Sequence, residues 1–317
     1  MIAAVTAYND DDAVLKLIEA LAAQTRPIDV LLVVDNSRTP TLQGRLAREA
    51  ARVAHFEIEY HHFPENLGTA GATTFALDRA RCRRGDLLWT FDQDSVPAPD
   101  ALHHLEHYLV AERSRGARPI GIASCLPLLE PDGVPDHGQR FENFRFAHVA
   151  GSGSAPYDCD VVITSGAVVD LAATRGVPSP RLDFFIDSVD HEFCMKVRRA
   201  GLRVVVVPAA RMIHRIGAAR PARSMLRRRP IRLREYSPLR LYYITRNATF
   251  LETRLARFPW QLVAVPWRLR VMLRFVAGAL HEPSDRAGKV LACVVGTTHG
   301  LAGRLGRAPA GDAPQRG

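Results

Sequence analysis

The chain has 317 residues, 47% hydrophobic and 24% charged, which is ordinary for a globular protein and leaves room for one large domain or one domain with an appendage. Its five cysteines are odd in number and contain no Cys-x-x-Cys pair, which argues against a disulfide scaffold or a zinc site and favours a reducing compartment. No run of 18 uncharged apolar residues predicts a membrane-spanning helix, and the apolar start lacks the features of a signal peptide.

Charge is distributed unevenly along the chain. The segment from Arg215 to Arg274 contains fifteen Arg, no Lys and two acidic residues, which gives it a charge of +13. The whole chain carries +9, so the remainder is mildly acidic at −4. This asymmetry points to a polyanionic partner, namely a membrane surface, a nucleic acid or a phosphorylated substrate.

The first 120 residues alternate strand and helix patterns. Short apolar runs predict strands over 2–7, 30–34, 56–61 and 87–91, and periodic patterns predict helices over 11–25, 43–53 and 70–81. Four βα repeats indicate a parallel α/β sheet with helices on both faces. Ligands of such sheets bind outside the carboxyl ends of the strands, so Asn9, Asp35 and Asp92 are expected to face that rim.

The remainder of the chain is less regular. Strand-like runs at 161–164 and 166–169 lie between loops rich in Gly and Pro, and a helix over 192–200 precedes a strand over 203–207. Residues 218–234 form an Arg/Pro-rich linker. Amphipathic patterns then predict helices over 239–257, 260–280 and 289–305.

Two carboxylates, Asp92 and Asp94, follow directly after the apolar end of a predicted strand. Carboxylate oxygens are ligands that Mg²⁺ and Mn²⁺ prefer, and an ion held there would neutralise the diphosphate of an activated substrate. An isolated Asp-x-Asp pair is more often a solvated turn, so this interpretation depends on the residues around it.

Two further patterns lie close to predicted strand ends. Asp35 is a candidate acceptor for the N–H of a pyrimidine ring, and a turn acid or helix cap is an equal alternative. The sequence Asn66-Leu-Gly68-Thr-Ala-Gly71 precedes a helix, where the glycines permit close backbone approach and present N–H groups to an anion. Simple tight-turn packing is the alternative for these glycines.

Three acidic residues lie close together further along the chain, next to bulky apolar residues: Asp187, Asp190 and Glu192. Such surroundings can raise the pKa of a carboxylate and make Asp187 or Asp190 a general base. The alternatives are a cap role for Asp187, a structural acceptor role for Glu192 and a solvated acidic turn, which the neighbouring phenylalanines disfavour.

Two basic side chains are also candidates for the site. His214 is a possible third ligand for a metal such as Mn²⁺, although an ordinary structural role is commoner for a single histidine. Arg246, on a basic helix, has the bidentate donors that suit a diphosphate, with the helix surface as the alternative.

Taken together, these motifs resemble the family 2 glycosyltransferases, which have the GT-A fold. The form Phe91-Asp-Gln-Asp-Ser95, the motif Tyr242-Tyr-x-x-Arg-Asn247 and the closing residues 300–306 are similar to the bacterial rhamnosyltransferase branch. The resemblance covers roughly residues 1–250. Its other motifs, in chain order, are Asp35, Asn66-x-Gly68-x-x-Gly71, the acids of 187–192 and His214-x-x-Gly217.

The resemblance implies an α/β nucleotide-diphospho-sugar transferase fold, in which a Rossmann-like mixed sheet flanked by helices carries a C-terminal helical appendage. The expected catalytic domain is 1–217, with a nucleotide-sugar half at 1–120 and an acceptor half at 121–217. A basic helical region at 218–306 follows, and the tail 307–317 is expected to be disordered.

The resemblance also implies roles for individual residues. Asp92, Asp94 and His214 would hold Mg²⁺ or Mn²⁺ beside the diphosphate. Asp190 would be the catalytic base, with Asp187 as a rival because the family's base often follows Glu and here follows Val189. The residues implied in nucleotide-sugar binding are Thr6, Tyr8, Asn9, Asp35, Asn66, Gly68, Gly71, Asp92 and Arg246.

The expected reaction is an inverting, metal-dependent transfer of a sugar, in the first place L-rhamnose from dTDP-rhamnose, to a hydroxyl of a cell-envelope or lipid-linked glycan. Another donor, such as UDP-galactofuranose or a UDP-hexose, is one alternative. An inactive membrane- or polyanion-binding protein is a second alternative. Nucleic-acid binding is not expected, because no recognised binding module accompanies the charge.

The region 259–275 pairs two Trp with interspersed Arg around an apolar face. This pattern is typical of an interfacial helix on an anionic membrane, and a helix that packs on the catalytic domain is the alternative. We therefore expect a peripheral protein at the cytoplasmic face of the inner membrane.

Overall fold

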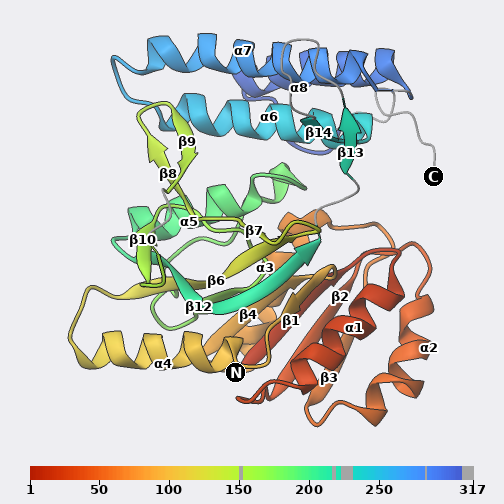
Figure 1. Cartoon of the computed structure of the whole chain (residues 1–317), viewed down its shortest axis with the longest axis vertical. Helices are drawn as coiled ribbons and strands as arrows, with labels where there is room; N and C mark the ends of the chain where they lie inside the picture. The colour runs from red at the N-terminus through yellow and green to blue at the C-terminus, as the bar shows by residue number, and fades with distance from the viewer. Residues whose placement is uncertain (150–152, 216–218, 223–230, 283, 309–317) are drawn as a thin grey trace. The chain divides into compact units, whose positions relative to one another are not determined.

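The computed structural model describes residues 1–149, 153–215, 219–222, 231–282 and 284–308 (Figure 1). The chain divides into two compact units, which are described one at a time. Unit 1 comprises Met1–Arg140, Ala147–Arg181 and Val189–Arg215; unit 2 comprises Phe141–Phe146, Leu182–Ser188 and the described part of Ile216–Gly317.

Unit 1 begins with the βα repeats that the sequence predicts. Strands β1 (Ile2–Ala7), β2 (Val30–Asp35), β3 (Glu57–His62) and β4 (Leu87–Asp92) are parallel and lie in the order β4-β1-β2-β3. They alternate with helices α1 (Asp11–Ala22), α2 (Thr41–Arg48), α3 (Gly68–Cys82) and α4 (Ala101–Ser114), and a 3₁₀ helix, η1 (Ala50–Arg52), follows α2. The predicted strands and helices of this half are confirmed, with ends displaced by a few residues.

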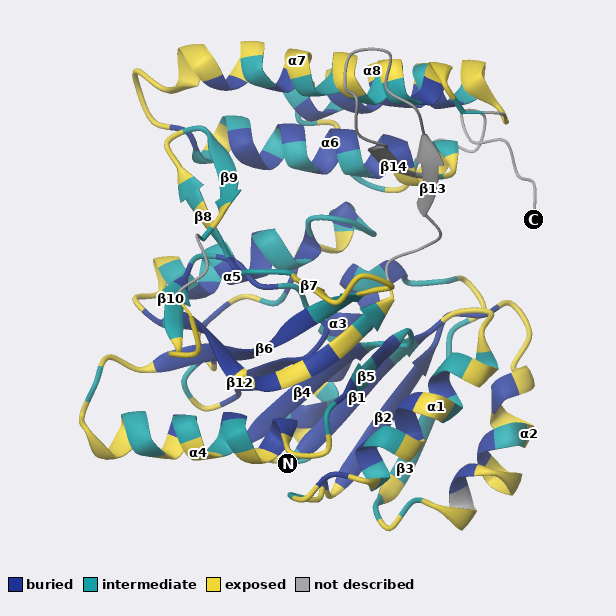
Figure 2. Cartoon of the chain, in the orientation of Figure 1, coloured by how far each residue is buried: buried dark blue, intermediate teal, exposed yellow. Residues whose placement is uncertain are grey.

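These strands are buried on both faces, which explains their continuous apolar sequence. In β1, Val5 belongs to one core cluster together with Leu17 of α1 and Leu105 of α4, and Leu42 of α2 belongs to the same cluster. Helix α3 covers the opposite face of the sheet, behind it in the view of Figure 1. Figure 2 shows β1, β2 and β4 buried along almost their whole length.

The complete sheet is mixed. Strand β11 (Ala167–Asp170) runs antiparallel between β4 and β6 (Ile120–Glu130), and the long strand β12 (Arg203–Arg215) is parallel to β6. Helix α5 (Val189–Arg199) precedes β12. The shorter strands of the sheet are β5 (Ser95–Pro97), β7 (Val134–Pro135) and β10 (Tyr157–Cys159).

Two predictions for this part of the chain need correction. The predicted strand at 161–164 does not form; Val161 makes an isolated bridge with Gln139, and the residues after it run as an irregular, partly buried segment. An apolar run of this length does not distinguish a strand from such a segment. The strand predicted to end at Val207 continues to Arg215, because a bulge between Val207 and Arg211 accommodates Pro208.

Unit 2 contains helices α6 (Pro238–Leu255), α7 (Gln261–Leu280) and α8 (Arg286–Ala302), and these confirm the three helices predicted there. It also contains the two-stranded pair β13 (Ala219–Ala222) and β14 (Ile231–Arg234), and the 3₁₀ helix η2 (Leu182–Phe184). Residues 141–146 form the turn between β8 (Gln139–Glu142) and β9 (Arg145–His148) with their adjoining ends. The predicted disorder of the tail concerns residues that, from 309 onward, lie outside the described ones.

Helices α6 and α8 approach closely because glycines of α8 face the backbone of α6. A Cβ atom on Gly296 would lie 2.5 Å from the carbonyl oxygen of Tyr242, and one on Gly300 would lie 2.8 Å from Cβ of Thr249.

Within the described residues, no helix combines the length and the apolar character that crossing a bilayer requires.

The close approach predicts opposite effects for one substitution at two glycines. Gly296→Ala should lower the free energy of unfolding by about 1–3 kcal/mol, because the added methyl group collides with α6. Gly278→Ala in α7, where no atom lies within 4 Å of the added carbon, should raise it by up to about 1 kcal/mol. Denaturant unfolding followed by circular dichroism measures both, and equal shifts would contradict the packing.

Candidate active site

The polar residues at the ends of the parallel strands lie in register at one rim of the sheet. Thr6 of β1 pairs with Asp92 of β4, and Ala7 of β1 pairs with Asp35 of β2. Because parallel strands end at the same edge, residues from three separate βα repeats meet there. This confirms the expected placement of Asp35 and Asp92 at the rim.

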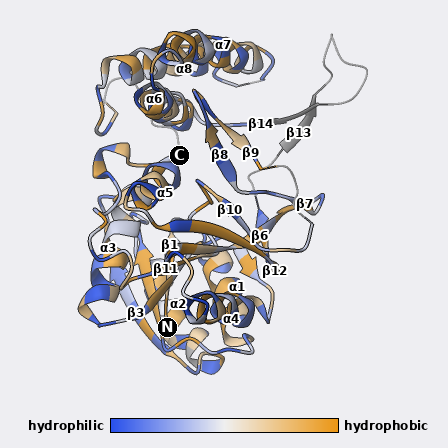
Figure 3. Cartoon of the chain, turned by 90° about the vertical axis from the view of Figure 1, so that its left-hand side faces the viewer, coloured by the Kyte–Doolittle hydropathy of each residue, from blue (hydrophilic) through white to orange (hydrophobic). Residues whose placement is uncertain are grey.

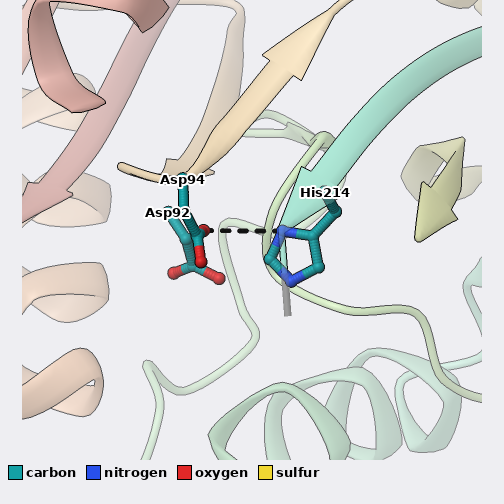
Figure 4. Close-up of side chains that lie close together, drawn as sticks. All are labelled: Asp92, Asp94 and His214. Carbon is teal, nitrogen blue, oxygen red and sulfur yellow. Dashed lines mark ion pairs between the residues drawn. The ribbon is translucent and has the colours of Figure 1, made fainter. Parts of the chain in front are cut away.

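Asp92, Asp94 and His214 form a cluster at this rim (Figure 4). One possible ligand atom from each side chain lies within 4.8 Å of the others, and Oδ1 of Asp94 lies 3.5 Å from Nδ1 of His214. Two carboxylates and one imidazole suit a divalent cation such as Mn²⁺. The residues present therefore fit the predicted metal.

Strand pairing explains how residues so distant in sequence come together. After Asp94 the chain forms β5, which pairs antiparallel with the end of β12 and sets Ser95 opposite His214. The N–H of Arg215 donates to the carbonyl of Asp94 at 3.1 Å. Strand β5 was not expected from the sequence, because three residues carry no periodic signal.

Two buried serines support the cluster and were missed in the sequence analysis. The hydroxyl of Ser95 is hydrogen-bonded to Nδ1 of His214 at 2.8 Å. Ser165 donates to Ser95 Oγ at 2.7 Å and accepts from the N–H of Asp92 at 3.0 Å. Partners of this kind fix the orientation of a ligating imidazole, so these serines complete the cluster.

Asp35 is fully buried, and its carboxylate has partners within the protein. Tyr60 donates its hydroxyl to Oδ2 at 2.7 Å, and the N–H of Ser37 donates to Oδ1 at 2.9 Å. Burial and this carboxylate raise the pKa of Tyr60, which keeps the phenol a donor. Tyr60 was missed because a tyrosine in a strand resembles an ordinary core residue. Direct contact of Asp35 with a base stays a prediction.

The loop after β1 lies next to the Asp92–Asp94 turn. Tyr8, with 51% of its surface exposed, donates its N–H to Oε1 of Gln93 at 2.6 Å, and Nε2 of Gln93 donates to the carbonyl of Tyr8 at 3.0 Å. Asn9 has a left-handed backbone (φ 51°) and donates its N–H to Oγ of Ser37 at 2.8 Å. Asn9 also lines an open polar hollow of about 400 Å³ with Arg38.

The Asn66–Gly71 turn is held by its own hydrogen bonds. Gly68 has φ 67°, which favours glycine, and its N–H donates to Oδ1 of Asn66 at 2.9 Å. A Cβ on Gly71 would lie 2.5 Å from Cβ of Leu67. These contacts are those of a tight turn, the alternative for the two glycines; contact of the glycines with an anion stays a prediction.

Asp190 lies in the first turn of α5 and lines a narrow cavity with Thr90 of β4 and Phe193. Its Oδ1 accepts from the N–H of His191 at 2.8 Å and lies 2.8 Å from Nδ1 of the same residue. Burial acts to raise the pKa of Asp190, but the charge and hydrogen bonds of His191 outweigh it, so the pKa lies below its ordinary value. The expectation of a raised pKa is therefore wrong for Asp190.

One irregular segment connects this cavity with the metal cluster. Val162, Ile163 and Thr164 line the cavity beside Asp190, and the next residue, Ser165, bonds to the backbone of Asp92. Thr90 donates its hydroxyl to the carbonyl of Thr164 at 2.6 Å, which fixes the segment on β4. The segment mispredicted as a strand thus serves both sites.

Two predicted site residues belong to unit 2. Asp187 has φ 63°, and its Oδ1 lies 3.5 Å from Nη2 of Arg240. Arg246 is fully buried, and its guanidinium donates to the carbonyls of Asp183 and Gly306. A guanidinium enclosed in this way does not reach a diphosphate, so this arrangement does not support the donor-binding role predicted for Arg246.

Comparison with known proteins shows what this chain is similar to. Residues 3–120 match the model of glycosyl transferase family 2. The chain is 28% identical over 257 residues to the dTDP-rhamnosyl transferase RfbF of Shigella flexneri, with 78% of each chain covered.

Solved structures share the fold. S. aureus TarS 1-349 in complex with UDP aligns with a TM-score of 0.54 at 13% identity, covering 96% of this chain and 81% of that one. The mannosyltransferase PcManGT from Pyrobaculum calidifontis, in complex with GDP-Man and Mn²⁺, also aligns with a TM-score of 0.54 at 13% identity, covering 96% and 87%. Identities this low establish the fold alone.

The cluster predicts a measurable Mn²⁺ site. Asp94→Asn and His214→Ala should each weaken Mn²⁺ binding by about tenfold or more, because each removes one ligand. Electron paramagnetic resonance of free Mn²⁺, titrated with protein in the presence of dTDP, measures the affinity. His104→Ala, at a partly exposed position of α4, is the control and should leave it unchanged. Equal affinities for all four proteins would contradict the site.

Proposed function

We propose that this chain, a family 2 glycosyltransferase with the GT-A fold, transfers L-rhamnose from dTDP-rhamnose to a hydroxyl of a cell-envelope or lipid-linked glycan. The observation that carries the proposal is the cluster of Asp92, Asp94 and His214 at the carboxyl ends of the strands. The choice of sugar rests on the similarity to the dTDP-rhamnosyl transferase RfbF.

In this proposal the cluster is the place where the donor diphosphate binds. A divalent cation bound there, Mn²⁺ or Mg²⁺, would supply positive charge next to the phosphate oxygens. Asp92 and Asp94 would hold it with His214, whose ring Ser95 orients. Gln93 is hydrogen-bonded to both the N–H and the carbonyl of Tyr8. It would hold the turn between Asp92 and Asp94 against the loop after β1, where the nucleoside is expected.

Asp190 is the proposed base. A lowered pKa keeps its carboxylate ionised at neutral pH, as a proton acceptor must be. The carboxylate would accept the proton of the acceptor hydroxyl as the oxygen bonds to the anomeric carbon and the bond to the nucleoside diphosphate breaks. A single displacement of this kind inverts the anomeric centre. His191 would hold the carboxylate in place through its ring Nδ1.

The donor identifies the function most directly. Purified protein with Mn²⁺ should transfer or hydrolyse the sugar of dTDP-rhamnose, and chelation of the metal should abolish the release of dTDP. UDP-galactofuranose and UDP-hexoses, offered under the same conditions, test the alternative donors. Release of nucleotide from a UDP sugar and none from dTDP-rhamnose would overturn the proposed donor, and no release from any donor would favour an inactive polyanion-binding protein.

Within that assay, matched variants separate the two candidate bases. Asp190→Asn should reduce the rate of transfer by about 10²-fold or more, because the proton acceptor is lost. Asp187→Asn makes the same change, from a carboxylate to an amide, at the other candidate base. A larger loss for Asp187→Asn would transfer the proposed role to Asp187.

We also propose that α7 binds an anionic membrane. Leu262, Leu269, Leu273 and Leu280 recur at helical spacing on one face and are exposed, Leu262 by 70% and Leu273 by 61%. Hydrophobic and hydrophilic residues lie side by side along this helix (Figure 3). The inward side instead carries a charge: Arg268 is buried and pairs with Glu252 at 3.1 Å.

The exposed apolar face of α7 has basic flanks, and this combination favours lipid over a protein partner. Arg270 and Arg274 are exposed beside the leucines. Leucines entering the acyl boundary and arginines contacting anionic headgroups would act together. Peripheral binding at the cytoplasmic face of the inner membrane is consistent with a lipid-linked acceptor.

The membrane contact predicts a composition-dependent partition. The protein should sediment with vesicles containing phosphatidylglycerol and only weakly with phosphatidylcholine vesicles. The double variant Leu269→Glu/Leu273→Glu should bind the phosphatidylglycerol vesicles at least about tenfold more weakly, because two apolar side chains become charged. Val110→Glu, an exposed apolar position of α4, is the matched control. Unchanged sedimentation of the double variant would contradict the assignment.

A further inference from the structure

Two sequence motifs remain without a role in the proposed reaction. They are Tyr242-Tyr-x-x-Arg-Asn247 in α6 and the residues after α8 that end at Gly306. In unit 2 both contact the same segment, Leu182–Ser188, which we call the acid loop because it contains Asp183 and Asp187. The next residue in the chain, Val189, begins the helix that carries Asp190.

Asn247 is the centre of these contacts. It is fully buried, and its Nδ2 donates to three carbonyl oxygens of the acid loop: Phe184 at 2.9 Å, Ile186 at 2.8 Å and Asp187 at 2.9 Å. A single amide group thus gathers carbonyls from both ends of a four-residue stretch. The backbone there is fixed from one point.

Arg246 completes the same arrangement. Its Nη2 donates to the carbonyls of Asp183 at 2.8 Å and Phe184 at 3.2 Å, and its Nε donates to Oδ1 of Asn247 at 2.8 Å. The last bond orients the amide so that its NH₂ group faces the loop. The carbonyl of Asp183 also accepts from the N–H of Gly306 at 2.9 Å, so the second motif joins the contact.

Aromatic rings cover the guanidinium of Arg246. Its central carbon lies 4.7 Å from the ring centre of Tyr243 and 5.3 Å from that of Tyr242. The ring of Tyr243 lies 5.2 Å from that of Phe185 in the acid loop. Tyr243, Arg246 and Asn247 therefore all contact one segment of the chain, and the ring of Tyr242 covers the guanidinium of Arg246.

The acid loop needs such support because its backbone is unusual. Phe185, Asp187 and Ser188 have φ values of 64°, 63° and 60°, in the left-handed region that residues with a side chain avoid. Three such residues within four positions persist when surrounding contacts over-determine them. The hydrogen bonds from Asn247 end within this stretch, at Ile186 and Asp187, and just before it at Phe184. Those from Arg246 end just before it, at Asp183 and Phe184.

We propose that Arg246 and Asn247 are positioning residues for the base. They hold the acid loop in its left-handed conformation and so fix Asp187 and the start of α5, from which Asp190 projects one residue later. The inference rests on the proposed function for its catalytic consequence, but its structural part concerns this chain alone. On this inference the motif holds a segment of the protein's own backbone, in place of the diphosphate contact predicted for Arg246.

The test uses Asn247→Asp, which keeps the size of the side chain and places a carboxylate against three carbonyl oxygens. Hydrogen–deuterium exchange of peptides spanning 182–192 should rise by about tenfold or more, because the loop and the first turn of α5 open more often. Tyr242→Phe is the matched control: it removes the hydrogen bond to His299, 2.9 Å long, without touching the acid loop. Arg246→Lys, which loses the forked donor, should give a smaller change in the same peptides.

Kinetics then separate positioning from general support. In Asn247→Asp the kcat of transfer should fall by about 100-fold while the Kd for dTDP with Mn²⁺ stays within about twofold, because a displaced base slows chemistry without altering donor binding. Unchanged exchange over 182–192 overturns the inference whatever the activity. Faster exchange with unchanged kcat also overturns it. If the wild type transfers no sugar, the proposed function fails, and the exchange measurement still decides whether the motif holds the loop.

Discussion

The antiparallel pairing of β5 with the end of β12 is the contact on which the site depends. It sets Ser95 opposite His214 and thereby brings an imidazole to two carboxylates about 120 positions earlier in the chain. The parallel strands alone would leave Asp92 and Asp94 as an acidic turn at the rim. The buried Ser95–Ser165 hydrogen bond then locks the turn to the segment that lines the cavity of Asp190.

Electrostatics divide the site into two parts with different tasks. At the metal cluster, two carboxylates from the end of β4 and the turn after it converge with an imidazole from β12. At Asp190, one histidine neighbour lowers the pKa of a partly buried carboxylate and keeps it ionised. The arginines of the C-terminal part fall into two groups. Arg246 and Arg268 are buried and hydrogen-bonded, whereas Arg270 and Arg274 of α7 are exposed.

The parts of the fold that could be predicted are those with a local signal. The limits of β1 follow from a simple apolar run, and the metal cluster follows from side-chain chemistry at strand ends. Other features depend on distant contacts and leave no such signal. Strand β5 exists because β12 lies beside it, and Tyr60 serves Asp35 through pairing of neighbouring strands. Arg246 was misjudged because a charged residue on a basic helix is usually exposed, and here three carbonyl groups enclose it.

The separation of His214 from the aspartates has a consequence for biosynthesis. A ribosome releases residues 92 and 94 long before residue 214, so the early βα repeats can collapse while the third ligand is still being made. All three residues of the cluster are therefore present only after the first 214 of the 317 residues have been made. A fragment that ends before residue 214 would carry the two aspartates without the imidazole, and it would hold a divalent cation more weakly than the complete cluster.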